Sequence, residues 1–158
     1  MLLRTTTFEC TALVNAPADK VFATVAEPLN MVGLQPFLIR CDILKKEVSA
    51  DLRTRAYDVY FIERFHLLGP IRYDNKIRVH IDIQSEPRQV HFHVKSFPRI
   101  RLRSSYVFED QAGATLVRET VTVESPSLLA SFVVKTARAA QERLLENLRR
   151  KLDGSRYQ

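Results

Sequence analysis

The chain has few of the residues that mark specialised classes of protein. It contains no tryptophan, 2 cysteines and 4 glycines among 158 residues. Cys10 and Cys41 are too few for a disulfide framework and lack the spacing of a metal site, so we expect reduced, packed thiols. Glycine-rich phosphate loops and nucleophile motifs are also missing. The sequence therefore predicts no metal, no cofactor and no nucleophilic catalysis.

Long apolar runs and blocks of like charge are missing as well. No stretch approaches the ~18 apolar residues that span a bilayer, and the opening MLLRTTTFEC does not resemble a secretory signal. We therefore expect a cytoplasmic protein, with one domain over residues 1–158, as a monomer or homodimer. The net charge is +6, but the basic residues are scattered, so no nucleic-acid partner is expected. Peripheral contact with an anionic membrane stays open.

The hydrophobic period changes twice along the chain. Residues Thr6–Val14 alternate as in a strand, and Asn15-Ala16-Pro17 then begins a short helix that Pro28 ends. Leu29–Leu34 suggests a second short helical turn. From Phe37 onward the period is two, with short polar links, which predicts about six antiparallel strands.

The last thirty or so residues predict one long amphipathic helix. Ser125-Pro126-Ser127 is a helix start, with a hydroxyl cap followed by proline. Apolar residues then recur at three- and four-residue spacing as far as Leu152, and Gly154 is a plausible stop. Some 25 helical residues would extend roughly 37 Å, enough to cross a sheet.

This order of elements resembles the START-like, or SRPBCC, superfamily with its helix-grip fold. The opening FECTALVNAPADKVFATVAEPLNM and the closing SPSLLASFVVKTARAAQERLLENLRRKL carry the resemblance. It implies an α+β fold in which a curved seven-stranded antiparallel sheet wraps around the long C-terminal helix, with two short helices between strands 1 and 2. It also implies an apolar cavity between the sheet and the helix.

Alternation along the strands indicates which side chains face inward, because a slip of one residue would reverse every side chain. Small residues in the middle of the helix suggest that space is kept open there. On this basis the expected ligand-binding residues are Tyr57, Phe61, Glu63, Phe65, Ile81, Phe92, Ser104, Tyr106, Glu119, Val133, Ala137 and Ala140.

Glu63, Ser104, Tyr106 and Glu119 interrupt the apolar inward face. A hairpin closed near Gly113 would place Glu119 close to Ser104. One interpretation is that these groups are polar handles in a cavity, one of them acting as an acid or base with a raised pKa. The other is that the carboxylates lie at an open rim, or pair with an arginine of the helix or with Arg40.

The opposite face carries His80, Asp82, His91 and His93. Three histidines and one carboxylate are chemically able to bind zinc. However, Arg78 and other cations share this face and oppose metal binding, so a solvated sheet surface is the favoured interpretation.

The leading functional hypothesis is a non-enzymatic protein that binds a hydrophobic small molecule, such as a lipid, quinone or polyketide-like compound. The alternative is an enzyme resembling polyketide cyclases and dehydratases, with Glu63, Glu119 and Tyr106 as acid–base residues. A lipid or quinone carrier whose basic surface meets an anionic membrane is a third hypothesis.

Overall fold

The computed structural model describes residues 2–68 and 70–154, which form seven strands, three α-helices and two 3₁₀ turns. The elements in chain order are β1 (Leu3–Val14), α1 (Ala18–Ala26), η1 (Pro28–Asn30), α2 (Met31–Leu34), β2 (Leu38–Val48), β3 (Thr54–Leu68), β4 (Ile71–Gln84), β5 (Gln89–Ser96), β6 (Ile100–Gln111), β7 (Ala114–Pro126), η2 (Ser127–Leu129) and α3 (Ala130–Gly154).

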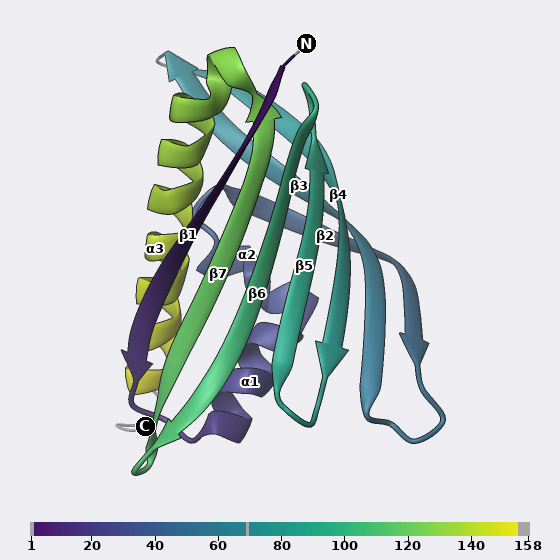
Figure 1. Cartoon of the computed structure of the whole chain (residues 1–158), viewed down its shortest axis with the longest axis vertical. Coiled ribbons are helices and arrows are strands. Elements are labelled where there is room, and N and C mark those ends of the chain that lie inside the picture. The colour runs from purple at the N-terminus through teal and green to yellow at the C-terminus, as the bar shows by residue number, and fades with distance from the viewer. Residues whose placement is uncertain (1, 69, 155–158) are drawn as a thin grey trace.

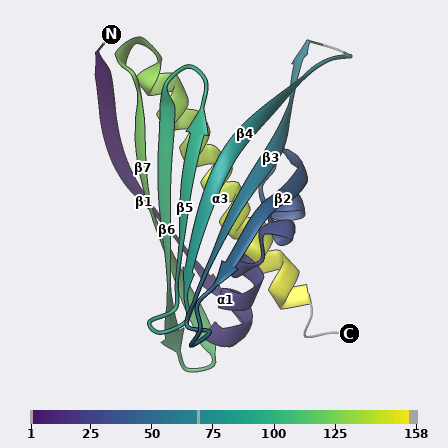
Figure 2. The same cartoon turned by 90° about the vertical axis from the view of Figure 1, so that its right-hand side faces the viewer.

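All seven strands belong to one antiparallel sheet with the order β1-β7-β6-β5-β4-β3-β2. The three helices lie on the same side of this sheet (Figure 1). The sheet curls around α3, with β1 on one side and strands β3 and β4 on the other (Figure 2). The predicted helix-grip fold, with its two short helices between strands 1 and 2, is confirmed.

The helices begin and end close to the predicted points. Pro17 directly precedes α1, where a missing N–H costs nothing, and α3 is 25 residues long. The predicted hydroxyl cap is wrong, because Ser125 belongs to β7 and its buried Oγ makes no hydrogen bond within the part of the chain that the structure describes. Ser127 Oγ instead donates to the carbonyl oxygen of Leu2 at 3.1 Å, which ties the start of η2 to the residue just before β1.

The inward face of the sheet agrees with the alternation in the sequence. Every predicted inward residue is buried or half-buried. Most of them join α1, α2 and the second half of α3 in one hydrophobic core. Among the inward residues that are only half-buried, Glu63, Phe65, Val94 and Leu102 all lie toward the same end of the sheet. The packing is therefore looser at that end.

Candidate ligand-binding cavity

A cavity of about 560 Å³ lies at the looser end, between the sheet and the first half of α3. Its walls come from β3, β4, β5 and β6 on one side and from α3 on the other, and the segment after α2 closes one flank. Aliphatic and aromatic side chains form most of the wall. An apolar, concave site of this size with a few polar groups has the composition typical of a small-molecule pocket.

One face of α3 supplies the helical wall. Val133, Ala137, Ala140 and Leu144 recur at three- and four-residue spacing and all line the cavity. The alanines in the middle of this face leave space that longer side chains would fill. The wall therefore depends on small residues at the positions that face the sheet.

Nine of the twelve expected ligand-binding residues line the cavity: Phe61, Glu63, Phe65, Phe92, Ser104, Tyr106, Val133, Ala137 and Ala140. Tyr57, Ile81 and Glu119 do not, because they lie in the filled part of the core, where each is at most 3% exposed. Tyr57 and Ile81 are direct cross-strand partners in that filled region. The part that any of the twelve plays in ligand binding remains a prediction.

Sequence reasoning missed Gln141, Thr136 and Phe132, which also line the cavity. Gln141 lies four residues after Ala137 and therefore on the same helical face. That spacing was the available signal, but a glutamine in a charged stretch of helix is usually solvent-exposed. Here its side chain is only 9% exposed.

Polar groups meet at the inner end of the cavity. The Ser104 hydroxyl donates to Glu119 Oε2, which confirms the predicted proximity of the two residues. The Tyr106 hydroxyl donates to Gln141 Oε1 at 3.3 Å. Glu119 is fully buried behind the cavity wall, and its Oε1 makes no hydrogen bond with the residues that the structure describes. The alternative in which Arg40 pairs with an inward carboxylate is not observed, since Arg40 forms an ion pair with Asp42.

Burial dominates the electrostatics of both inward carboxyls. Desolvation raises the pKa of Glu119 to about 7, and the hydrogen bond from Ser104 and the nearby hydroxyl of Tyr106 oppose this rise. Desolvation alone raises the pKa of Glu63 to about 7. Burial also raises the pKa of Tyr106, and the neighbouring Glu119 adds to that rise. Around neutral pH both carboxyls are therefore poised between the neutral and the charged form.

A family model described as "Polyketide cyclase / dehydrase and lipid transport" matches residues 5–153. The chain belongs to this family. The predicted START-like superfamily is thereby confirmed, and membership supports either binding of a hydrophobic ligand or a cyclase role.

Solved structures share the fold of this cyclase/dehydrase-family chain at low sequence identity. A Thermus thermophilus protein, TTHA0849, is 15% identical with a TM-score of 0.72, covering 95% of this chain and 99% of that one. The Zhui aromatase/cyclase of Streptomyces sp. R1128 is 16% identical with a TM-score of 0.67, covering 94% and 96%. A START superfamily protein of Mycobacterium smegmatis is 14% identical with a TM-score of 0.61, covering 94% and 97%. No curated protein matches the sequence.

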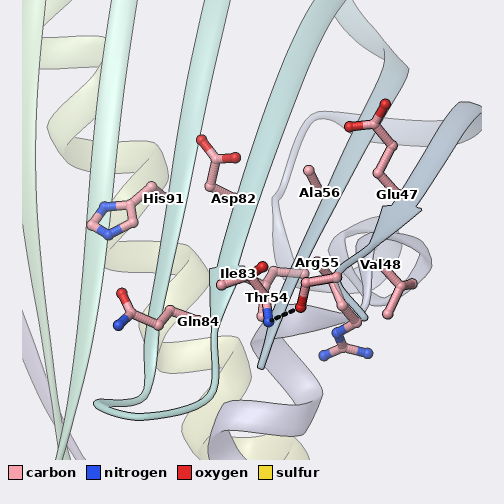
Figure 3. Close-up of a pocket in the computed structure, with 10 residues that line it drawn as sticks. Glu47, Val48, Thr54, Arg55, Ala56, Asp82, Ile83, Gln84 and His91 are labelled. Atoms are coloured by element: carbon pink, nitrogen blue, oxygen red, sulfur yellow. Dashed lines mark hydrogen bonds between the residues drawn. The ribbon is translucent and has the colours of Figure 1, made fainter. Parts of the chain in front are cut away.

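This member of the family also has a hollow of about 600 Å³ on the outer face of the sheet, next to the β2–β3 turn. Figure 3 shows the carboxylates of Glu47 and Asp82 and the ring of His91 around the small side chain of Ala56. These charged and polar groups are suited to water rather than to an apolar ligand. We therefore assign the candidate site to the inner cavity.

Two of the outer histidines, His80 and His93, lie close to carboxylates on the outer face of the sheet. His80 Nδ1 lies 2.8 Å from Asp58 Oδ1, and His80 Nε2 lies 3.0 Å from Asp82 Oδ1. The hydrogen bond with Asp58 is the main cause that raises the pKa of His80. His93 Nε2 lies 3.5 Å from the second oxygen of Asp82. Across residues 2–68 and 70–154, no group of three or more potential metal ligands is arranged to hold a metal ion.

None of the helices within residues 2–68 and 70–154 is both long and apolar enough to cross a membrane. The two cysteines are free, and burial is the main cause that raises the pKa of each thiol to about 11.

Proposed function

We propose that this protein binds an apolar small molecule, such as a lipid, quinone or polyketide-like compound, in the inner cavity. The observation that carries the proposal is the cavity itself: about 560 Å³ of space with a mainly apolar wall. A filled core would bury the same face without leaving such space, at a gain of roughly 25 cal/mol per Å² of apolar surface removed from water. Keeping the space open costs stability, which binding of a ligand offsets.

The test changes one side chain on each face of α3. Ala140 is buried and lines the cavity, whereas Ala139 is exposed on the same helix. We expect Ala140→Phe to weaken binding of the neutral fluorescent probe N-phenyl-1-naphthylamine at least about tenfold, because the ring occupies the ligand's space. Ala139→Phe is the matched control and should leave the dissociation constant unchanged.

Urea unfolding of the same two variants separates a blocked cavity from a damaged fold. Ala140→Phe should keep a denaturant midpoint near that of the original protein, because the ring enters existing space. A large loss of stability would mean that this part of α3 packs on a filled core, and the binding proposal would fail. It would fail equally if the original protein bound no probe.

Acid–base catalysis of the cyclase type is a second candidate, favoured by Glu63, whose carboxyl lines the cavity with a pKa of about 7. The geometry supports this function less well. Among the described residues no hydrogen bond joins Glu63 to Tyr106, and Glu119 lies outside the cavity wall. Turnover of a poly-β-ketone thioester that is lost in Glu63→Gln would favour the enzyme; absence of turnover would favour the carrier.

We also propose that the cavity mouth contacts an anionic membrane. Three aromatic side chains that line the cavity are exposed to solvent: Tyr73 is 53% exposed, Phe97 is 87% and Phe132 is 72%. An exposed cation lies within three residues of each one in the sequence: Arg72, Arg99 and Lys135. Aromatic groups surrounded by cations suit the boundary between acyl chains and anionic headgroups.

Vesicle sedimentation tests this contact. We expect binding to vesicles that contain phosphatidylserine, with less binding at high salt, and weak binding to phosphatidylcholine vesicles. Phe132→Ser should reduce binding severalfold. Leu52→Ser is the control, because Leu52 is 73% exposed but lies in the β2–β3 turn, away from the cavity residues. This contact would be ruled out if both variants lost vesicle binding equally, or if the original protein did not bind the vesicles.

A further inference from the structure

Gln141 brings an amide group to the inner end of the cavity. Its side chain is 9% exposed and lines the cavity. The amide oxygen is already used, because the Tyr106 hydroxyl donates to Gln141 Oε1 at 3.3 Å. The amide nitrogen forms no hydrogen bond with any residue that the structure describes. Gln141 therefore has a donor left over, although it lies in an apolar environment.

The unused donor faces open space rather than packed atoms. Within the described part of the chain, the enclosed side-chain polar atoms that lack a partner are Glu119 Oε1 and Ser125 Oγ. The nitrogen of Gln141 is not one of them, so it keeps accessible surface, and the space next to this side chain is the cavity. A ligand that filled this space without an acceptor would bury the N–H unpaired, at a cost of about 1–3 kcal/mol, so a ligand that places an acceptor there is favoured.

The Tyr106 hydroxyl holds the amide in this orientation. It lies beside the buried carboxyl of Glu119, whose Oε2 already accepts a hydrogen bond from Ser104, and it donates its own proton to Gln141 Oε1. Because a hydroxyl has only one proton to donate, this bond turns the oxygen of Gln141 toward Tyr106 and leaves its NH₂ group toward the cavity.

We propose that Gln141 determines specificity in this cavity by donating a hydrogen bond to an acceptor oxygen, such as a ketone or quinone carbonyl, at the buried end of an apolar ligand. This inference rests on the proposed binding function. Thr136 is another polar residue on the helical wall of the cavity, and no side-chain hydrogen bond links it to Tyr106. Thr136 therefore provides a matched comparison.

The experiment compares 2-acetylnaphthalene with 2-ethylnaphthalene, which have nearly the same shape but differ in one carbonyl oxygen. We expect the original protein to bind the ketone about five- to tenfold more tightly than the hydrocarbon. Gln141→Met keeps the length of the side chain and removes the donor, so the preference for the ketone should vanish or reverse. Thr136→Val should keep the preference.

The outcomes separate the two proposals. If the original protein binds neither probe, the binding function fails and this inference fails with it. If it binds both but Gln141→Met keeps the preference for the ketone, the role of Gln141 is overturned and the binding function stands. The inference is also overturned if the original protein binds the two probes equally.

A second measurement does not depend on the variant folding. In ¹H–¹⁵N spectra of the original protein, the side-chain NH₂ signals of Gln141 should shift when 2-acetylnaphthalene is added. 2-Ethylnaphthalene should shift them much less, because it cannot accept a hydrogen bond. Equal shifts with the two probes would overturn the proposal.

Discussion

The second half of α3, after Leu144, packs on a filled core, whereas the first half, up to Leu144, faces a cavity. Leu145, Leu148 and Leu152 are each at most 3% exposed. In the first half, Val133 and Ala137 are only half-buried although they point at the sheet. Both halves continue one apolar stripe, so the stripe alone cannot explain the difference.

The short helices explain much of this contrast. Asn147 Nδ2 donates to the carbonyl oxygen of Leu34 at 2.8 Å, which ties α2 to the second half of α3. Asp153 accepts a hydrogen bond from the backbone of Asn15, just before α1, at 3.3 Å. The second half of α3 is thus tied to α2 and to the segment that precedes α1, on the same face of the sheet. The first half presents alanines to a sheet that curls around it, and space remains.

Leu148→Ala should have the largest effect on stability. This side chain is 0% exposed in the filled half, and its loss leaves a void that cannot collapse fully. We expect the free energy of unfolding to fall by about 3–5 kcal/mol, measured by urea denaturation. Lys151→Ala, on the exposed side of the same half, is the control and should cost little. A cost for Leu148→Ala as small as the control's would mean that this half is not filled.

Glu119 lies at the border between the two halves, behind the cavity wall. The free energy of unfolding of Glu119→Gln, measured at several pH values, tests whether this carboxyl is enclosed. The folded pKa of Glu119 is about 7, above its ordinary value of 4.5. Between these values the folded protein holds a proton that the unfolded chain has released, so the free energy of unfolding falls as pH rises through this window. The glutamine of this variant does not titrate, so the variant escapes this loss of stability. The free energy of unfolding of Glu119→Gln minus that of the original protein should therefore be higher above pH 7 than below pH 4.5, by on the order of 2–3 kcal/mol.

Glu63→Gln sharpens the same test. Glu63 has a similarly raised pKa of about 7, but its side chain is half-buried and faces the cavity, where water screens the charge. The gain in the free energy of unfolding at high pH should therefore be smaller for Glu63→Gln than for Glu119→Gln. Glu142→Gln, on the exposed face of α3, should show little gain. If the stability difference between Glu119→Gln and the original protein did not change with pH, the carboxyl of Glu119 would not be enclosed as described.

Val133→Ala should have the smallest effect. Its side chain is half-buried and lines existing space, so truncation enlarges the cavity without creating a new sealed void. We expect a loss below about 1 kcal/mol by urea denaturation. A cost similar to that of Leu148→Ala would show that both halves of α3 pack on a filled core, and the contrast between them would disappear.

The sequence by itself determined the elements and their inner faces. Proline at positions 17 and 28, the change from a helical period to a period of two, and the terminal apolar stripe predicted the order of elements that is observed. The predicted proximity of Ser104 and Glu119 is also confirmed. These features follow from local rules, because backbone geometry fixes which side chains share a face once the type of element is known.

Only the tertiary structure decided how deep each inward residue lies and whether the space beside it is filled. Tyr57, Phe61 and Ile81 share the inward face, yet only Phe61 lines the cavity. Gln141 acquires its role from Tyr106, a partner 35 positions away in the sequence. Curvature of the sheet and the placement of α1 and α2 set these depths. They arise from contacts between distant segments, which periodicity along the chain does not record.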